Sequence, residues 1–456
     1  MNNQSMVDRD LAVLWHPCSQ MQDYAPVNGD NAQIPLIPIK SGSGVWLADF
    51  EGKRYLDAIS SWWVNLFGHA NPIINQALKE QLEMLEHVIL AGFTHEAAVT
   101  LAEKLVEITP FGLQKCFYAD NGSSAVEVAM KMSFHYWQNL GSPQKTKFIT
   151  LENSYHGETL GALAVGDVAL YKRIYAPLLM AVITVPGPDC FYREPEESWE
   201  DYSIRRFAIM EQILAQHAET VCAVIIEPLV QCAGNMRMYH PVYLTMLREA
   251  CDRYQVHLIA DEIAVGFGRT GSLFACEQAG VSPDFMCLSK GLTGGYLPLS
   301  AVLTTDTVYQ AFYADYQKLS AFLHSHSYTG NALGCRAALT TISLFQQRDV
   351  IADNRRLAAL MAKAAEHFQA HPHVADVRQT GMILAIELIK NKQTREVYPW
   401  QERRGLRVYK FALQRGVLLR PLGNVIYFMP PYIINEQEIN LMIEVAWQGI
   451  LHAVQD

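Results

Sequence analysis

The stretch Asp284-Phe-Met-Cys-Leu-Ser-Lys290-Gly-Leu-Thr-Gly-Gly295 places a lysine directly after a short apolar run and before a series of small residues. Upstream, Leu258-Ile-Ala-Asp261-Glu262 ends another apolar run in a carboxylate. A lysine amine can form a Schiff base with an aldehyde cofactor, and a carboxylate can keep a pyridinium nitrogen protonated, so the two together suit pyridoxal phosphate. A lone lysine after a strand is usually only a solvated strand end. The pairing with Asp261 and with a candidate phosphate site favours the cofactor interpretation.

The apolar run before Lys290 is one of six in the middle of the chain. These runs do not alternate with polar residues, and helix-like stretches separate them; they cover residues 115–119, 147–151, 221–226, 257–260, 285–288 and 300–304. Strands of this kind are buried on both faces. The pattern predicts an α/β fold with a mostly parallel central sheet and helices on both faces.

Beyond residue 340 the pattern changes to helices mixed with short strands. Helix-like stretches cover 331–347 and 353–370, strand-like stretches follow at 374–379 and 382–388, and a last helix starts near Glu436. This predicts a smaller α+β lobe, completed by strands near the N-terminus. We therefore expect a large cofactor-binding domain at 71–339 and a small domain built from 1–70 and 340–456.

A candidate phosphate site lies in Asp120-Asn-Gly122-Ser123-Ser124, between a predicted strand and a predicted helix. Gly122 lets the backbone approach an anion closely, the helix N-terminus supplies free N–H groups, and Ser123 adds a hydroxyl. An ordinary helix cap is an equally good interpretation of the same residues, because Asn and Ser are preferred there in any case.

Other polar and aromatic residues follow neighbouring runs. Tyr155, in Asn153-Ser-Tyr155-His156-Gly157, follows one run, Glu227 follows another and Asp261 a third. Open α/β sheets bind ligands at the carboxyl ends of their strands, where Tyr155 can stack on a cofactor ring. Taken alone, Tyr155 is as well explained as a turn residue covering the core. The convergence of several such residues at one edge favours a binding site.

The composition excludes several other classes of protein. The chain has 456 residues and a net charge of −10, whereas nucleic-acid-binding proteins usually present a basic face. No apolar stretch has the roughly 18 residues that a membrane span needs. The N-terminal residues lack the apolar segment of a signal peptide, which favours a cytoplasmic location. The fifteen histidines and nine cysteines show no metal-binding spacing, so no metal is expected.

Two stretches give a specific family resemblance that covers nearly the whole chain. They are Leu258-Ile-Ala-Asp-Glu-Ile-Ala-Val-Gly-Phe-Gly-Arg-Thr-Gly271 and Ser289-Lys-Gly-Leu-Thr-Gly-Gly295. Together they resemble the class III, or ω-, aminotransferases of the fold-type I group, which depend on pyridoxal 5'-phosphate. The resemblance implies a homodimer with its active site at the subunit interface.

The resemblance also implies roles for single residues. Lys290 carries the cofactor, Asp261 pairs with its ring nitrogen and Tyr155 stacks on the ring. The phosphate and the rest of the cofactor are held by a further set of residues: Gly122, Ser123, Glu227 and Ser327. Of these, Ser327, in His324-Ser-His-Ser-Tyr-Thr-Gly-Asn331, is the phosphate ligand given by the second subunit.

Three further stretches resemble a branch of this class that aminates 8-amino-7-oxononanoate to 7,8-diaminononanoate in biotin biosynthesis. They are Leu14-Trp-His-Pro17, Ser60-Ser-Trp62-Trp63 and Leu419-Arg420-Pro-Leu-Gly-Asn-Val-Ile-Tyr427-Phe-Met-Pro-Pro431. In that branch the arginine matching Arg420 binds the substrate carboxylate, for which a planar guanidinium is well suited. Residues matching Trp62 and Tyr427 line the substrate channel, together with Tyr155 and Lys290. Hydrophobic core is the alternative interpretation of these aromatics, and the better one for Trp63.

The amino donor is less clear from the sequence. The overall match favours S-adenosylmethionine, whereas Gly294-Gly-Tyr-Leu-Pro298 and the stretch from His324 to Asn331 are similar to relatives that use lysine. Cys18 stands where the branch has a tyrosine, Glu158 replaces an aspartate and Cys232 replaces a glycine. Two wider alternatives are an ω-amino acid:pyruvate aminotransferase and a non-catalytic protein that binds pyridoxal phosphate.

Overall fold

The computed structural model describes residues 2–25 and 32–455, and the chain forms two compact units. The larger unit comprises Pro72–Arg355 and Gln379–Met382, and the smaller comprises Met1–Asn71, Arg356–Arg378 and Ile383–Asp456. Residues 340–355 thus group with the larger unit, whereas the sequence analysis assigns them to the small domain. The domain boundary at 339 itself stays a prediction.

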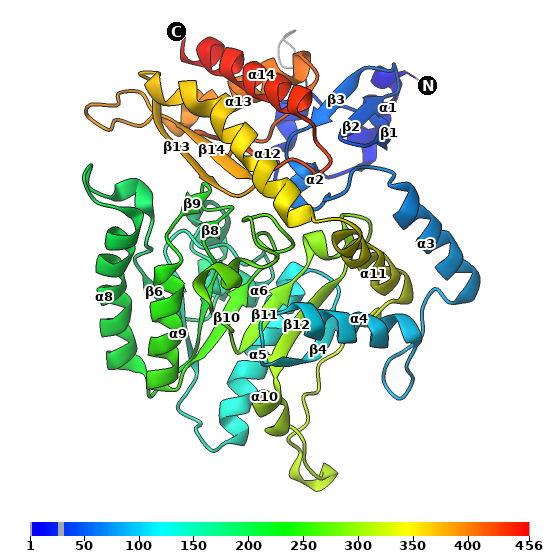
Figure 1. The fold of residues 1–456 in the computed structure, drawn as a ribbon, viewed down its shortest axis with the longest axis vertical. Coiled ribbons are helices and arrows are strands. Elements are labelled where there is room, and N and C mark those ends of the chain that lie inside the picture. Colours follow the sequence, from blue (N-terminus) through cyan, green and yellow to red (C-terminus); the bar gives the residue numbers. More distant parts are fainter. Residues whose placement is uncertain (1, 26–31, 456) are drawn as a thin grey trace. The chain divides into compact units, whose positions relative to one another are not determined.

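The larger unit is built on a seven-stranded sheet in the order β4-β12-β11-β10-β7-β5-β6 (Figure 1). Its strands are β4 (Leu113–Ala119), β5 (Lys147–Leu151), β6 (Ile183–Val185), β7 (Val221–Ile226), β10 (His257–Asp261), β11 (Phe285–Leu288) and β12 (Ser300–Thr305). β12 runs antiparallel to both of its neighbours, and the pairs from β11 to β6 are parallel. The predicted mostly parallel sheet is therefore confirmed.

Helices lie on both faces of this sheet, as predicted (Figure 1). Those of the larger unit are α3 (Pro72–Met84), α4 (Glu96–Ile108), α5 (Gly122–Asn139), α6 (Leu160–Val165), α7 (Ala169–Lys172), α8 (Trp199–His217), α9 (Val242–Tyr254), α10 (Asp306–Gln310), α11 (Ala332–Gln347) and the start of α12 (Val350–Ala365). Short 3-10 turns include η2 (Arg173–Leu178), η3 (Cys190–Tyr192), η4 (Ala275–Ala279), η5 (Lys290–Thr293) and η6 (Tyr316–Lys318), and a small ribbon joins β8 (Val230–Gln231) to β9 (Arg237–Met238).

The core of the larger unit lies between α5 and the sheet. Every residue of β7, β10 and β11 is buried, which is why their sequences are continuous apolar runs. α5 packs against β4, β7, β10, β11 and β12, and its small residues Ala125 and Ala129 let it lie close to them. The N-terminus of α5 is thereby held at the edge where the parallel strands end.

The smaller unit contains two sheets. One has the order β1-β2-β3-β15 and the other β13-β14-β16. The elements are α1 (Asn3–Val13), η1 (Met21–Tyr24), β1 (Ile39–Ser43), β2 (Trp46–Asp49), β3 (Arg54–Asp57), α2 (Ser60–Trp63), η7 (Glu366–Ala370), β13 (Val374–Thr380), β14 (Ile383–Leu388), η8 (Trp400–Glu402), α13 (Arg404–Gln414), β15 (Val417–Leu418), β16 (Val425–Phe428) and α14 (Glu436–Val454). The α+β character that the sequence predicts for this part is present.

The central sheet has one strand more than the six that the sequence predicts. The edge strand β6 has only three residues, too few for a pattern of its own. In the larger unit, His95 caps α4, because its ring nitrogen accepts the backbone N–H of Ala98. None of the helices formed by residues 2–25 and 32–455 combines the length and the apolar character needed to span a bilayer.

Gly381 gives a test of close backbone packing in the larger unit. Its φ is +56°, and an added Cβ would lie 2.3 Å from the carbonyl carbon of Thr270. Gly280 has a similar φ of +63° but open space around it. We expect Gly280→Ala to cost about 1–2 kcal/mol from left-handed backbone alone, and Gly381→Ala to cost about 1–3 kcal/mol more through overlap. Urea unfolding followed by circular dichroism measures both, and equal losses would contradict the packing argument.

Candidate active site

The candidate site is set at the edge where four neighbouring strands end. β5, β7, β10 and β11 are parallel, so the residues that follow them meet at their carboxyl ends. Tyr155 and His156 follow β5, Glu227 follows β7, Asp261 ends β10, and Lys290 follows β11. All of these residues belong to the larger unit.

Asp261 and His156 form a buried pair. His156 Nδ1 lies 2.7 Å from Asp261 Oδ2, and both side chains are shielded from solvent. The other carboxylate oxygen, Oδ1, accepts the backbone N–H of Ile263 at 3.1 Å. Since a carboxylate accepts, His156 donates through Nδ1, and its buried Nε2 has no hydrogen-bond partner among the described residues. The pair holds the Asp261 carboxylate in a single orientation.

The Glu227 carboxylate accepts hydrogen bonds from the backbone of two loops at the same edge. Its Oε1 accepts the backbone N–H of Tyr155 at 2.9 Å, and its Oε2 accepts the backbone N–H of Cys232 at 3.0 Å. Burial raises the pKa of Glu227 to about 7, a rise that His156 counteracts and Asp261 reinforces. The structure therefore gives Glu227 a positioning role at the site, beside the cofactor-binding role predicted for it.

Lys290 is the first residue of η5, and its backbone is left-handed, with a φ of +46°. Burial lowers the pKa of its amine, against the opposing influence of Asp261, Cys232 and Glu227. A lowered pKa increases the fraction of neutral amine at a given pH, and only the neutral amine is a nucleophile. Lys290 thus has the electrostatic environment of a reactive lysine.

The N-terminus of α5, at Asn121, Gly122 and Ser123, packs closely against Gly157, and this region is here called the α5 cup. The side chain of Asn121 caps the helix by accepting the N–H of Ser124 at 3.1 Å. A Cβ on Gly122 would lie 3.0 Å from Ile263, and one on Gly157 would lie 2.1 Å from Ser123 Oγ. The cap interpretation of this stretch is therefore confirmed, because Asn121 caps the helix. The phosphate role of Gly122 and Ser123 stays a prediction, with which the close backbone packing at both glycines is compatible.

Tyr155 and Ser327 keep exposed surface. The Tyr155 hydroxyl donates to Glu158 Oε1 at 3.0 Å, and its ring meets the edge of Tyr171. Ser327 is exposed, and its carbonyl accepts a hydrogen bond from His87. Two roles stay predictions: the stacking of Tyr155 on the cofactor ring, and the binding of a partner subunit's phosphate by Ser327.

The three substrate candidates Trp62, Arg420 and Tyr427 belong to the smaller unit. The guanidinium carbon of Arg420 lies 4.5 Å from the Trp62 ring centroid, which is cation–π distance. Tyr427 is buried and accepts a hydrogen bond from the Trp63 indole at 3.0 Å. Trp63 is buried too, as its core interpretation predicts.

The Trp62 backbone is held in an unusual conformation. Ser60, Ser61, Trp62 and Trp63 all have positive φ, between 46° and 75°. Four consecutive left-handed residues other than glycine are costly, so other contacts must hold them. Asp57 does so: its Oδ1 accepts the N–H of Ser61 at 2.9 Å and its Oδ2 accepts the Ser61 hydroxyl at 2.7 Å. Such strain is typical of residues placed for function rather than for stability.

The residues of the larger unit fit pyridoxal phosphate. Lys290 is a buried amine of the kind that an aldehyde cofactor requires, and Asp261 is an oriented carboxylate of the kind that a pyridinium nitrogen requires. At the N-terminus of α5, where Gly122 and Gly157 have no room for a Cβ, the backbone has the form that a phosphate site would require.

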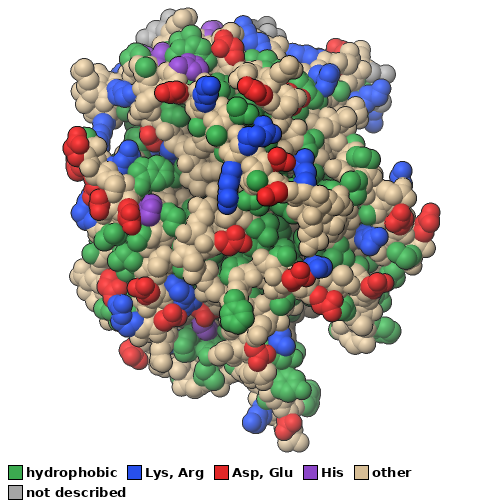
Figure 2. Space-filling view, viewed as in Figure 1, with side chains coloured by type: hydrophobic (Ala, Val, Ile, Leu, Met, Phe, Trp, Pro, Cys, Tyr) green, Lys and Arg blue, Asp and Glu red, His purple; other side chains and the backbone are tan. Residues whose placement is uncertain are grey.

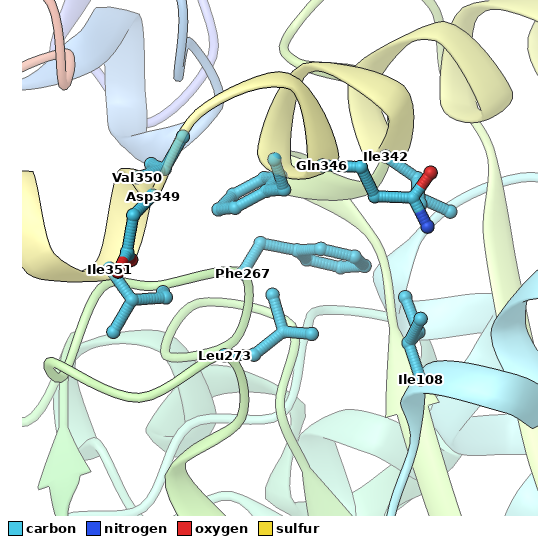
Figure 3. A pocket seen from close by; sticks show the side chains of 9 residues that line it. Ile108, Phe267, Leu273, Ile342, Gln346, Asp349, Val350 and Ile351 are labelled. Carbon is cyan, nitrogen blue, oxygen red and sulfur yellow. The ribbon is translucent and has the colours of Figure 1, made fainter.

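A separate pocket of about 180 Å³ lies elsewhere in the larger unit (Figure 3). It is lined by Ile108, Phe267, Leu273, Ile342, Phe345, Gln346, Asp349, Val350 and Ile351. Its walls are mainly apolar, and Asp349 is its one ionisable side chain. None of the predicted site residues lines it, so we do not assign it to the chemistry.

Sequence reasoning missed His156 and Asp57. His156 is next to Tyr155 in the quoted stretch, but its partner Asp261 is 105 residues away, so no local pattern joins them. Asp57 shows only as the polar end of a short strand. A histidine after one strand and an aspartate after the neighbouring strand is the signal that could have found the first pair.

Comparisons with known proteins agree with this geometry. Residues 27–449 match the family described as Aminotransferase class-III. A relative from Helicobacter pylori, named adenosylmethionine-8-amino-7-oxononanoate aminotransferase, is 48% identical over 436 residues, 94% of each chain. A relative of the same name from Geobacter sulfurreducens is 43% identical over 445 residues, 97% of this chain and 96% of its own.

Solved structures give the same result. The aminotransferase of that name from Methanocaldococcus jannaschii superposes with a TM-score of 0.92 at 37% identity, over 98% of this chain and 99% of its own. An omega transaminase from Pseudomonas jessenii in complex with PMP has a TM-score of 0.92 at 28% identity, over 99% and 98%. The chain therefore belongs to the class III aminotransferases and is a transaminase that depends on pyridoxal phosphate.

Proposed function

We propose that the protein transfers an amino group from S-adenosylmethionine to 8-amino-7-oxononanoate, giving 7,8-diaminononanoate for biotin biosynthesis. The observation that carries this proposal is the 48% identity, over 94% of each chain, to a relative whose name states this donor and this acceptor. The lysine, carboxylate and phosphate-cup residues at one sheet edge supply what a transaminase requires. The cytoplasmic location expected from the sequence is part of the proposal.

The cofactor, when bound, supplies an electron sink that stabilises negative charge on the amine-bearing carbon. The chain's own residues do the rest. The Lys290 amine, with its lowered pKa, would take a proton from that carbon as general base and then give it up at a different carbon as general acid. Asp261, oriented by His156, holds the proton on the ring nitrogen, and Glu227 holds the backbone of Tyr155 in place.

Arg420 is suited to the carboxylate of the acceptor. It is partly buried, it lies over Trp62, and it makes no ion pair with any carboxylate in the described parts of the chain. A guanidinium without an acidic partner, backed by an aromatic face, is available for a substrate carboxylate. Trp62 is 38% exposed and offers apolar surface for the acceptor's hydrocarbon chain, whereas Tyr427 is buried and its channel-lining role stays a prediction.

The names of the relatives and the residues of this chain favour different amino donors. The relatives' name favours S-adenosylmethionine. The stretch from His324 to Asn331 and the loss of an aromatic at Cys18 favour lysine. A sulfonium and an ammonium are both cations, and either can lie against an aromatic face, so charge does not separate them. We choose S-adenosylmethionine because the similarity to relatives of that name extends over the whole chain.

A homodimer belongs to the proposal as well. Large apolar side chains are exposed on the segment after α10. They are Tyr313, Tyr316, Leu319, Leu323 and Tyr328. Figure 2 shows apolar side chains, mixed with charged ones, at the lower end of the larger unit, where this segment projects. Exposed apolar groups of this density are typical of a surface covered in an assembly. The same segment carries Ser327, the residue expected to reach the phosphate of a second subunit.

The carboxylate role of Arg420 predicts a specific kinetic defect. Arg420→Ala should raise the KM for 8-amino-7-oxononanoate about ten- to a hundredfold, since a charge-assisted hydrogen bond contributes roughly 1.5–3 kcal/mol. Arg415→Ala is the matched control, because Arg415 also lies over an aromatic ring, that of Phe411, in the same unit. The control should keep its KM. An unchanged KM in Arg420→Ala would remove Arg420 from the acceptor site.

The donor and the reaction class are tested together by product analysis. The protein with pyridoxal phosphate and 8-amino-7-oxononanoate should form 7,8-diaminononanoate, detected by mass spectrometry, when S-adenosylmethionine is added. Product with lysine alone would reverse the donor assignment and keep the acceptor. No product with either donor, together with amino transfer to pyruvate, would show an ω-amino acid:pyruvate aminotransferase instead.

A further inference from the structure

A chain of polar contacts joins α5 to the segment that carries Ser327, here called the 322–330 segment. Lys131 Nζ lies 2.9 Å from His324 Nδ1, and His324 Nε2 lies 3.1 Å from His326 Nε2. His326 Nδ1 in turn lies 3.4 Å from Asp120 Oδ2. Asp120 immediately precedes Asn121, the cap of α5, so the chain of contacts ends beside the phosphate cup.

The hydrogen-bond partners determine which nitrogen of each ring donates and which accepts. An ammonium only donates, so His324 must accept at Nδ1 and carry its proton on Nε2. His326 then accepts at Nε2 and carries its proton on Nδ1, facing the Asp120 carboxylate. His324 accepts from Lys131 and donates to His326, so it is neutral, and every contact points from the Lys131 cation towards the Asp120 anion. A second proton on either ring would set two donors against each other.

The surroundings of His324 agree with a neutral ring. Burial, Lys131 and His326 lower its pKa, and Glu127 acts in the opposite direction. His135, also on α5, lies with its ring centroid 6.5 Å from that of Phe322, and its pKa is lowered by burial and by Lys131. The His324 ring stacks on Phe322 with centroids 5.7 Å apart and tilts against Phe117. Aromatic packing and the polar contacts thus fix this ring together.

Two more histidines hold the same segment through its backbone. His87 Nε2 donates to the Ser327 carbonyl at 2.8 Å, and His95 Nε2 donates to the Gly330 carbonyl at 2.8 Å. His95 accepts the Ala98 N–H at its other ring nitrogen. Four of the fifteen histidines in the chain therefore hold one short segment.

We propose that His324 and His326 are positioning residues for the cofactor phosphate. Through their contacts they link the α5 cup of one subunit to the Ser327 hydroxyl of the same chain, which serves the cup of the partner subunit. The inference rests on the proposed function, because it takes the dimer and the phosphate role of Ser327 from there. The contacts themselves lie within one chain. Protonation of His324 breaks its contact with Lys131, releases the 322–330 segment and weakens cofactor binding.

The sign of the pH dependence follows from the direction of the shift. The pKa of His324 in the folded protein lies below its ordinary value, so the neutral ring and its contacts are complete at pH 7.5. They are lost as the pH falls below the ordinary histidine pKa of about 6.5 and passes through the lowered value. Cofactor retention should therefore fall in mild acid.

The test uses the full-length holoenzyme and the variant His324→Phe, which keeps the ring between Phe322 and Phe117 but removes both polar contacts. At pH 7.5, hydrogen exchange in the 322–330 segment, corrected for intrinsic rates, should be faster in the variant by roughly two- to tenfold, the equilibrium effect of one hydrogen bond. Dissociation of pyridoxal phosphate, measured by dialysis and absorbance, should increase by a similar factor. In the wild type both should rise between pH 7.5 and 5.5, and in His324→Phe they should rise less.

His217→Asn, at the end of α8, is the control for loss of a histidine elsewhere in the same unit and should behave as the wild type. Unchanged exchange in the 322–330 segment of His324→Phe would overturn the proposal, whatever the activity of the protein. Faster exchange with unchanged cofactor dissociation would overturn the link to the phosphate. Neither result depends on which donor or acceptor is used, so both remain distinct from a failure of the proposed reaction.

Discussion

The parallel alignment of β5, β7, β10 and β11 is the constraint on which the rest of the site depends. Because these strands are neighbours and run in the same direction, their carboxyl ends meet at one edge. The residues after them are separated by up to 135 positions, from Tyr155 to Lys290, yet they share one small region. The same alignment brings α5, packed across the sheet, to present its N-terminus at that edge. Cofactor chemistry thus follows from strand order and from four short segments.

Burial then shifts the pKa values of the ionisable residues at this edge. An amine out of water loses its proton more readily, and a carboxylic acid keeps its proton longer. The lowered pKa of Lys290 and the raised pKa of Glu227 are the two sides of this effect. Each buried polar group is also oriented: Asp261 by His156, and the Tyr155 backbone by Glu227. In the smaller unit, Asp57 similarly orients a strained turn that presents Trp62.

The sequence predicted the fold well where local pattern is strong. The six apolar runs are all strands of the central sheet, and helices at Ala332–Gln347 and Glu436–Val454 lie within a residue of their expected starts. It also predicted that Lys290, Asp261, Glu227 and Tyr155 follow strands at one edge. It could not predict His156 as the partner of Asp261, the left-handed run at residues 60–63 or the chain of polar contacts from Lys131 to Asp120. Each of these depends on contacts between segments far apart in the chain, which no local periodicity encodes.

The central claim is that Lys290 is the amine that binds the cofactor. The direct measurement is to incubate the protein with pyridoxal phosphate, reduce it with borohydride, digest it and map the pyridoxyl group by mass spectrometry. The account predicts that the label lies on the peptide containing Lys290, and that Lys290→Ala carries none. A label on any other lysine, or an unlabelled wild-type protein, would contradict it.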